Sequence, residues 1–516
     1  MDVVGYSSSW SIPTGGQLNV HVSSRMSKFH ASLVRLQQGD PNPEGPGVKE
    51  FPVQWDGEGE YHADWHGIPS GSYMAINHFP SFVTGTLALW IKPALLMKCL
   101  QTIAATADWR IVIDPEGAIH FVSPFISVRS ANTLRPGEWT HVVVRWTDSA
   151  ADIGIKPKVN WPSQTVPIDA TSTIKVIPGK EGTLVFAAKL APDGISSDHF
   201  TGKLADLRLY DRWLADGVCP GFIADGEYEP AAFAHWSMTD DPSLMIVEDV
   251  CGHHAAILHQ MPVRGVTGPF WDGSHQRWYD CPPHYGAIAF NAEDKIDARW
   301  PVAFTLHLPE HCQSDVYAIK LSAGETVDHV PFFVRAQPGQ QQRVLFLAPT
   351  FSYLAYGNEH TAAHYIRTMP QIAEHNRQSI NPYPSQAEQR FILETGLNSL
   401  YDVRADGQGY CYASTRLPLL NFRPHTKFQM LDNLQGGAHQ FMADLFIVDW
   451  LQEKNILYDV ATDHDLHRDG VALLDQYDVV ITGTHHEYVS FAELDAVAHY
   501  VENGGKLMYM SGNGFY

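Results

Sequence analysis

The feature that most constrains the fold is a change of sequence pattern at residues 337–342. Before this segment, short β-prone runs separated by turn residues follow one another, as at 17–22 and 86–91, without a long amphipathic helix. After it, β-branched runs alternate with amphipathic segments of helical length, such as 491–503. The first pattern is typical of β-sandwiches and the second of a parallel sheet covered by helices. We therefore expect a multidomain chain that contains both architectures.

Four segments follow from this division of the 516 residues. Residues 266–336 are expected to contain a linker followed by an Ig-like β-sandwich. Residues 1–65 are expected to be β-strands that join this sandwich. Residues 66–265 are expected to form an inserted jelly roll, and residues 337–516 a doubly wound α/β domain of the flavodoxin or glutamine amidotransferase kind. Because the sequence stops soon after a strand expected to be central, we expect this last domain to be small or incomplete.

The charge balance limits the class of partner. There are 57 acidic and 35 basic residues, which give a formal net charge of −22, and Lys and Arg do not cluster. Nucleic acid and anionic membranes are therefore poor partners. No apolar run approaches the roughly 18 residues of a membrane helix, and the first residues lack a signal-peptide pattern. The six cysteines form no Cys-x-x-Cys pair, so we expect reduced thiols and a cytoplasmic location.

The β-rich segment resembles the concanavalin and laminin-G-like jelly rolls. Trp139-Thr-His-Val-Val-Val resembles the strand that these domains write as Trp-x-His-Val, and residues 200–210 resemble their Phe-x-Gly-x-Ile-Asp-x-Val-Arg-Ile-Tyr run. The resemblance implies a fold rather than a function, because some of these sandwiches bind sugars and others only contact partners. A non-catalytic or carbohydrate-binding protein is therefore one alternative for the chain.

Polar residues follow the expected strands of the α/β segment. His485 and Glu487 follow the strand at 479–482, and Asn513 follows the strand at 507–511. In an open α/β sheet, ligands bind at the carboxyl ends of the strands, so these side chains are site candidates by position. The alternative is a solvated loop whose His and Glu cap the next helix.

Several common catalytic patterns are absent from the sequence. No Gly-x-Ser-x-Gly or Gly-x-Cys-x-Gly elbow is present, which argues against a Ser or Cys nucleophile and against an amidotransferase-like hydrolase. Gly-x-Gly-x-x-Gly and Walker sequences are also absent, so no nucleotide-binding loop is expected.

Ordered motifs along nearly the whole chain resemble the large (beta) subunit family of N,N-dimethylformamidase. They include Arg35-Leu-Gln-Gln-Gly-Asp-Pro-Asn-Pro, residues 351–358, Tyr401-Asp, residues 420–424, 443–451 and 458–466, and Thr482-Gly-Thr-His-His-Glu-Tyr. The resemblance implies a hydrolase that cleaves N,N-dimethylformamide to dimethylamine and formate on a mononuclear Fe(III). It also implies a small partner subunit and homo-oligomerisation of the large one.

Carried over by motif, the resemblance implies Tyr356, Tyr401 and Glu487 as iron ligands, with His485 and Asn513 as catalytic residues. Two phenolates and a carboxylate are hard oxygen donors that suit a ferric Lewis acid. His486 stands where the family pattern has Pro, and residues 433–439 form an insertion. The resemblance therefore does not specify which amide is the substrate. Without the resemblance, either tyrosine would be interpreted as an ordinary core or rim residue.

Overall fold

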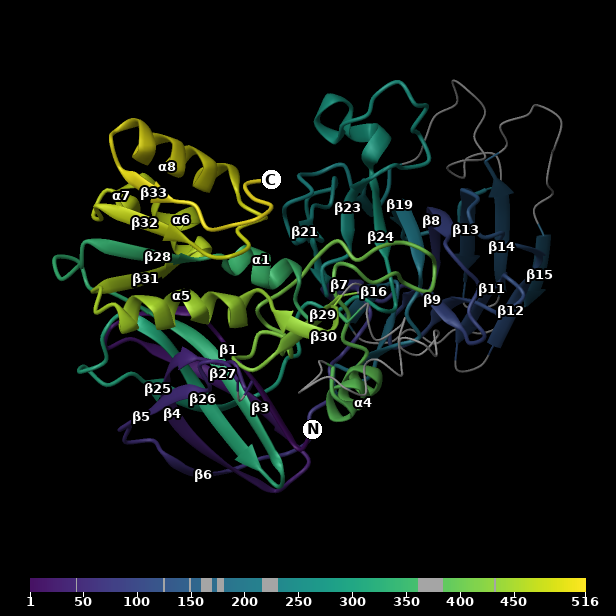
Figure 1. Cartoon of the computed structure of the whole chain (residues 1–516). Coiled ribbons are helices and arrows are strands. Elements are labelled where there is room, and N and C mark those ends of the chain that lie inside the picture. The colour runs from purple at the N-terminus through teal and green to yellow at the C-terminus, as the bar shows by residue number, and fades with distance from the viewer. Residues whose placement is uncertain are drawn as a thin grey trace. The chain divides into compact units, whose positions relative to one another are not determined.

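The computed structural model describes residues 1–42, 44–123, 126–147, 150–158, 169–173, 181–215, 231–360, 384–430 and 433–516 (Figure 1). The chain divides into two compact units. One consists of Met1–Ile68 and Ile296–Tyr516, and the other is Pro69–Lys295. None of the helices in these ranges has both the length and the apolar character needed to span a bilayer.

The Pro69–Lys295 unit is built from two mainly antiparallel sheets around one core. One sheet has the order β12-β11-β10-β9-β16-β7-β22-β21, and the other has the order β15-β14-β13-β8-β19-β24-β23 with β20 beside β19. Bulky side chains such as Trp146, Phe186 and Trp236 fill the core between them. The strands are β7 Tyr73–Phe79, β8 Gly85–Pro93, β9 Gln101–Ala105, β10 Arg110–Ile113, β11 Ala118–Ser123, β12 Ile126–Thr133, β13 Thr140–Trp146, β14 Ala150–Pro157, β15 Asp169–Thr173, β16 Gly182–Phe186, β17 Lys189–Leu190, β18 Ser196–Ser197, β19 Gly202–Tyr210, β20 Ala234–Trp236, β21 Ile246–Val247, β22 Ala256–His259, β23 Val263–Val266 and β24 Ala287–Phe290.

The structure is mostly β-sheet with few helices, which is consistent with the β-sandwich expected from the sequence. The run at 140–146 shows why the sequence pattern succeeds here. All seven side chains of β13 are buried, and the strand pairs on both sides with antiparallel partners, β8 and β14. A continuous Val-rich run fits a strand in the middle of a sheet, because neither of its faces meets water.

The other unit contains a second β-structure, which joins the segments that precede and follow residues 69–295 in the sequence. The strands are β1 Val3–Ser7, β2 Ser11–Pro13, β3 Gln17–Ser24, β4 Lys28–Gln38, β5 Lys49–Val53, β6 Gly59–His62, β25 Val302–His307, β26 Asp315–Ala323 and β27 Thr326–Arg335. Strand β3 lies between β1 and β25, and β4 lies between β26 and β5. The core includes Phe29, Leu306 and Phe332. Strands before residue 63 therefore share sheets with strands after residue 301.

A four-stranded parallel sheet in the order β31-β28-β32-β33 completes this unit. Helix α5 covers one face, and α6, α7 and α8 cover the other (Figure 1). The core beneath α5 also includes Val34 and Phe333, so α5 lies between the parallel sheet and the β4–β27 sheet. The elements are β28 Val344–Ala348, α1 Thr350–Ala355, α4 Gln386–Thr395, β29 Lys427–Met430, β30 Asn433–Ala438, α5 Phe441–Glu453, β31 Tyr458–Thr462, α6 Asp463–Asp469, α7 Val471–Leu474, β32 Val479–Thr482, α8 Phe491–Glu502 and β33 Lys506–Met508.

Candidate metal centre

The loop after β32 is held in place by buried side chains on two helices. Asp444 of α5 accepts hydrogen bonds from the Thr484 amide (2.6 Å) and the Thr484 hydroxyl (2.8 Å). Ser352 of α1, which is fully buried, accepts from the amides of Glu487 (3.0 Å) and Tyr488 (3.2 Å). These four bonds fix the backbone of the loop on both sides of His485, so the side chains of this loop start from a fixed position.

Tyr356 and Glu487 form the centre of the site. Tyr356 follows the last residue of α1, and its amide donates to the Ser352 carbonyl (3.0 Å). Its phenol donates to Oε2 of Glu487 at 2.6 Å, and the Glu487 residue is only 6% exposed. The side-chain amide of Asn421 donates to the Tyr356 backbone carbonyl (2.6 Å), which adds a second hydrogen bond to this residue's backbone. The phenol and carboxylate oxygens therefore meet at one point at the carboxyl edge of the sheet.

Tyr401 reaches the same point from the segment between α4 and β29. Its ring stacks on that of Tyr356, with the centroids 4.9 Å apart and the planes 24° apart. Its hydroxyl lies 2.7 Å from the Tyr488 hydroxyl. The amide of Tyr401 donates to the Ser399 hydroxyl (3.1 Å), which makes a tight turn before the ring. Three phenols and one carboxylate thus gather within a small volume.

His485 contacts the carboxylate from the side. Its Nε2 lies 3.0 Å from Oε2 of Glu487, and its Nδ1 lies 3.0 Å from the Gln440 amide nitrogen and 3.2 Å from Nε2 of His439. Because an amide NH2 can only donate, Nδ1 of His485 accepts, and Nε2 carries the proton toward Glu487. Burial lowers the pKa of His485 and lowers that of His439 to about 4, so both rings are neutral near pH 7.

The donor set fits a hard, highly charged cation. Burial, the hydrogen bond to Glu487 and the neighbouring Tyr401 all raise the pKa of Tyr356 well above its ordinary value. An unmetallated site therefore keeps the phenol protonated, whereas a cation bound to the same oxygen takes the place of that proton. Phenolate and carboxylate oxygens are the hard donors that ferric iron prefers over thiolates or thioethers.

Asn513, the remaining predicted site residue, lies outside this cluster, and so does His486, the departure from the family pattern. Asn513 is exposed, and among the described contacts its backbone carbonyl accepts from the Ser511 hydroxyl while its side chain has none with the three predicted ligands. His486 contacts a different side chain. It is 1% exposed, and its Nε2 lies 2.8 Å from Oδ1 of the buried Asp463. The catalytic role of Asn513 stays a prediction.

Three neighbours of the site were not predicted from the sequence: Tyr488, His439 and Gln440. Tyr488 follows Glu487 directly, so its position beside a predicted ligand was a usable signal. His439 and Gln440 lie between the β29–β30 hairpin and α5. No local pattern marks them, because only the packing of α5 against the sheet brings them to His485.

Comparison with known proteins places the chain in a family. Residues 263–516 match the family model described as "N,N-dimethylformamidase beta subunit-like, C-terminal". Over 99% of its length, the chain is 32% identical to the N,N-dimethylformamidase beta subunit of Paracoccus aminophilus, of which it covers 71%. The chain belongs to the N,N-dimethylformamidase beta subunit family. The corresponding subunit of an Alcaligenes species is 30% identical over the same share of each chain. The family expected from the sequence motifs is thereby confirmed.

Solved structures add little for this member of the N,N-dimethylformamidase family. A heptameric SAP-like pentraxin from Limulus polyphemus matches 36% of this chain and 78% of its own, with 14% identity and a TM-score of 0.22. A likeness of that size carries no argument about function. The carbohydrate-binding alternative stays a prediction.

Proposed function

We propose that this chain is the large subunit of an amidohydrolase that cleaves a small N-substituted formamide, N,N-dimethylformamide to dimethylamine and formate. Its family membership supports the reaction class. The observation that supports the site is the 2.6 Å contact between the Tyr356 phenol and the Glu487 carboxylate, with the Tyr401 ring stacked beside them. We also propose a small partner subunit, because both relatives are named beta subunits. The proposal further includes a cytoplasmic location and self-association of the large subunit.

In this proposal, Tyr356, Tyr401 and Glu487 hold a mononuclear Fe(III). Such an ion supplies Lewis acidity toward an amide carbonyl and lowers the pKa of water. Hydrolysis adds water across the amide bond: the formyl carbon gains a hydroxyl group, the C–N bond breaks, and the amine leaves with a proton.

The protein itself orients the metal-ligand atoms and places a group that can hold or transfer a proton. His485 keeps its proton on Nε2 because Gln440 donates to Nδ1, so the ring presents a donor toward the Glu487 carboxylate. A neutral imidazole next to a ligand carboxylate can hold or pass on a proton during attack and amine departure. The stacked ring of Tyr401 covers one face of Tyr356 and limits the directions from which water reaches its oxygen.

Metal analysis, visible spectra and turnover test this proposal. The purified protein should contain one iron and show a phenolate-to-iron charge-transfer band. Tyr356→Phe, Tyr401→Phe and Glu487→Gln should each reduce iron content and lower turnover by more than about 100-fold, since each removes a donor from the metal. The tyrosine variants should also weaken or shift the band.

Tyr509→Phe is the matched control. Its hydroxyl donates only to the nearby Gly512 carbonyl (3.2 Å) among the described contacts, and the residue is 43% exposed. This variant should keep the iron, the band and the turnover. Full iron content and unchanged turnover in all three site variants would refute the proposed site.

A further inference from the structure

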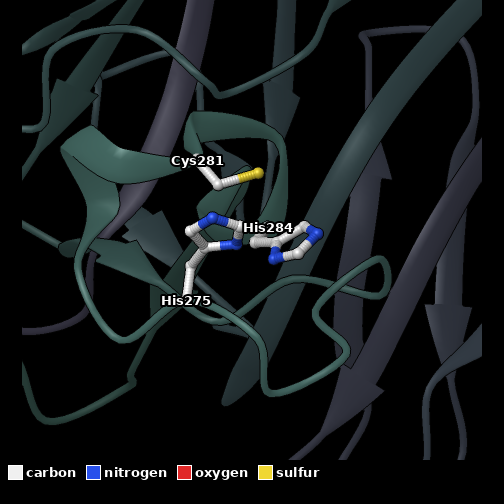
Figure 2. A group of neighbouring side chains, drawn as sticks. All are labelled: His275, Cys281 and His284. Atoms are coloured by element: carbon white, nitrogen blue, oxygen red, sulfur yellow. The ribbon is translucent and has the colours of Figure 1, made fainter.

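A second group of metal-binding side chains lies in the Pro69–Lys295 unit. His275, Cys281 and His284 each offer one ligand atom, and these three atoms lie within 4.8 Å of one another. Figure 2 shows the thiol and the two imidazole rings converging in the connection between β23 and β24. The iron site proposed above has only oxygen donors, whereas this group combines sulfur with nitrogen.

Backbone hydrogen bonds hold this connection in shape. The carbonyl of His275 accepts from the indole of Trp271 (3.0 Å) and from the phenol of Tyr285 (2.9 Å). Cys281 ends the 3-10 turn Trp278–Asp280 and begins the next one, Pro282–Tyr285. The amide of His284 donates to the Cys281 carbonyl (3.0 Å). The three residues therefore project from a defined backbone.

A hydrogen-bond chain sets the tautomer of His275. The hydroxyl of Ser274 lies 2.6 Å from Oδ1 of Asp272 and 2.8 Å from Nδ1 of His275. A hydroxyl has one proton, and the carboxylate can only accept it, so the Ser274 oxygen accepts from the proton on Nδ1 of His275. Nε2 of His275 then carries the lone pair. A histidine whose second nitrogen donates to a polar partner is the usual arrangement of a metal ligand.

His284 also has a nitrogen available. Its Nδ1 is buried and has no hydrogen-bond partner among the described residues. The nearest carboxylate oxygen, Oδ1 of Asp272, is 3.6 Å away, which is too long for a hydrogen bond. A buried nitrogen without a partner costs free energy that a bound ion would recover. The Asp272 carboxylate adds negative charge beside the cluster.

We propose that His275, Cys281 and His284 bind a zinc ion. Zinc binds thiolate and imidazole at about 2.3 and about 2.0 Å in a tetrahedron, so its ligand atoms lie roughly 3.5 Å apart. The three donors therefore need to close by only about 1 Å. Water takes the fourth position. On binding, the Cys281 thiol loses its proton and its sulfur bonds to the ion. The ion then cross-links residue 275 to the two 3-10 turns at 278–285 and stabilises this connection.

Thiol alkylation of the full-length wild-type protein tests the site without any substitution. Cys99, which is exposed and lies outside the cluster, is the control within the same molecule. After metal removal with a chelator, one equivalent of Zn2+ should slow alkylation of Cys281 by about tenfold or more, because a metal-bound thiolate is a poor nucleophile. Alkylation of Cys99 should not change. Equal rates at Cys281 with and without zinc would overturn the proposal.

Cobalt substitution provides a second measurement. One equivalent of Co2+ should give a thiolate-to-cobalt charge-transfer band in the near ultraviolet, and Cys281→Ser should abolish it, whereas Cys99→Ser should retain it. His284→Ala should lower the zinc content by one equivalent. Near-ultraviolet circular dichroism checks that each variant is folded. A folded Cys281→Ser protein with the wild-type zinc content would contradict the assignment.

The outcome is separate from that of the proposed iron centre. Cys281→Ser should keep the iron and its visible band, since that centre draws its ligands from the other unit. Conversely, Glu487→Gln should keep the thiolate-to-cobalt band.

Discussion

Tyr356 shows how much a single residue decides at the proposed iron site. Its phenol is protonated in the metal-free chain because burial and Glu487 raise its pKa. Metal uptake must therefore release this proton, and metal affinity should rise with pH. The contact between Tyr356 and Glu487 was predictable only through family motifs, since a tyrosine after a helix and a glutamate after a strand carry no local sign that they meet.

His486 is the residue at which this chain departs from the family pattern. Because its side chain is buried, we expect its substitution to change the stability of the fold. Its Nε2 lies 2.8 Å from Oδ1 of Asp463, and both residues are at most 1% exposed. The buried Glu493 belongs to the same cluster, and its pKa is raised to about 9 by burial and by the charge of Asp463. We expect His486→Ala to lower the free energy of unfolding by about 3 kcal/mol, because it leaves Oδ1 of the buried Asp463 carboxylate without the imidazole beside it, although the Phe351 amide still donates to Oδ2.

Urea denaturation of the full chain measures this loss. His499→Ala, on the exposed side of α8, is the control and should change stability by less than about 0.5 kcal/mol. Glu493→Gln in the His486→Ala background should leave the loss unchanged at pH 7, because the Glu493 carboxyl is already uncharged there and Gln can keep the helix cap. A loss below about 1 kcal/mol in the single variant would show that the pair is not stabilising.

At the scale of elements, the sequence pattern predicts the strands and helices that have a regular spacing of buried apolar residues. It is less successful for short helices, whose ends are set by capping side chains. The strand expected at 479–482 is β32, and the helix expected at 491–503 is α8. Helix α6 begins at Asp463 because Thr462 caps it in a reciprocal hydrogen-bonded box with Asp465, and α7 follows from Val471. Helix α4 was missed although Ser385 and Glu388 form a capping box and Gly396 ends the helix in the left-handed region.

The β4–β27 sheet carries a charge cluster that makes its stability depend on pH. Glu50 of β5 contacts Lys320 of β26 and His329 of β27, with Nε2 of His329 at 2.9 Å. These contacts, with that to His329 the largest, lower the pKa of Glu50 from 4.5 to about 2. Because the folded-state pKa is lowered, the stabilisation is present above pH 4.5 and is lost as the pH falls toward 2.

Glu50→Gln should therefore lower the free energy of unfolding by about 1 to 2 kcal/mol at pH 7, an amount reduced for the partial exposure of this carboxylate. At pH 3 the difference from wild type should shrink. Thermal unfolding at both pH values measures the effect, with Glu60→Gln on the exposed side of β6 as the control. An equal difference at the two pH values would contradict the assignment of the pH dependence to Glu50.

At the scale of the whole molecule, the Pro69–Lys295 unit interrupts the other unit at one place in the sequence. The chain enters and leaves it at neighbouring points, since the Gly71 amide donates to the Asp294 carbonyl (2.9 Å) and the Ser72 amide donates to the Asn291 carbonyl (3.1 Å). On the other unit, the Trp300 indole donates to the Gly67 carbonyl (2.9 Å). The sequence pattern led us to expect an insertion here, but the residue-to-residue pairing of distant segments cannot be predicted from local pattern, because register depends on which faces are buried together.

Because entry and exit are adjacent, residues 69–295 should be replaceable by a short Gly/Ser linker. The resulting chain should fold, since β3 still pairs with β25 and β4 with β26, and it should bind iron, since all three proposed ligands remain. A cooperative thermal transition and the iron band are the measurements. A chain that also lacks residues 1–68 is the control and should not fold, because β26 then loses its partner β4 and β25 loses β3. A linker chain that fails to fold while the intact protein folds would contradict this prediction.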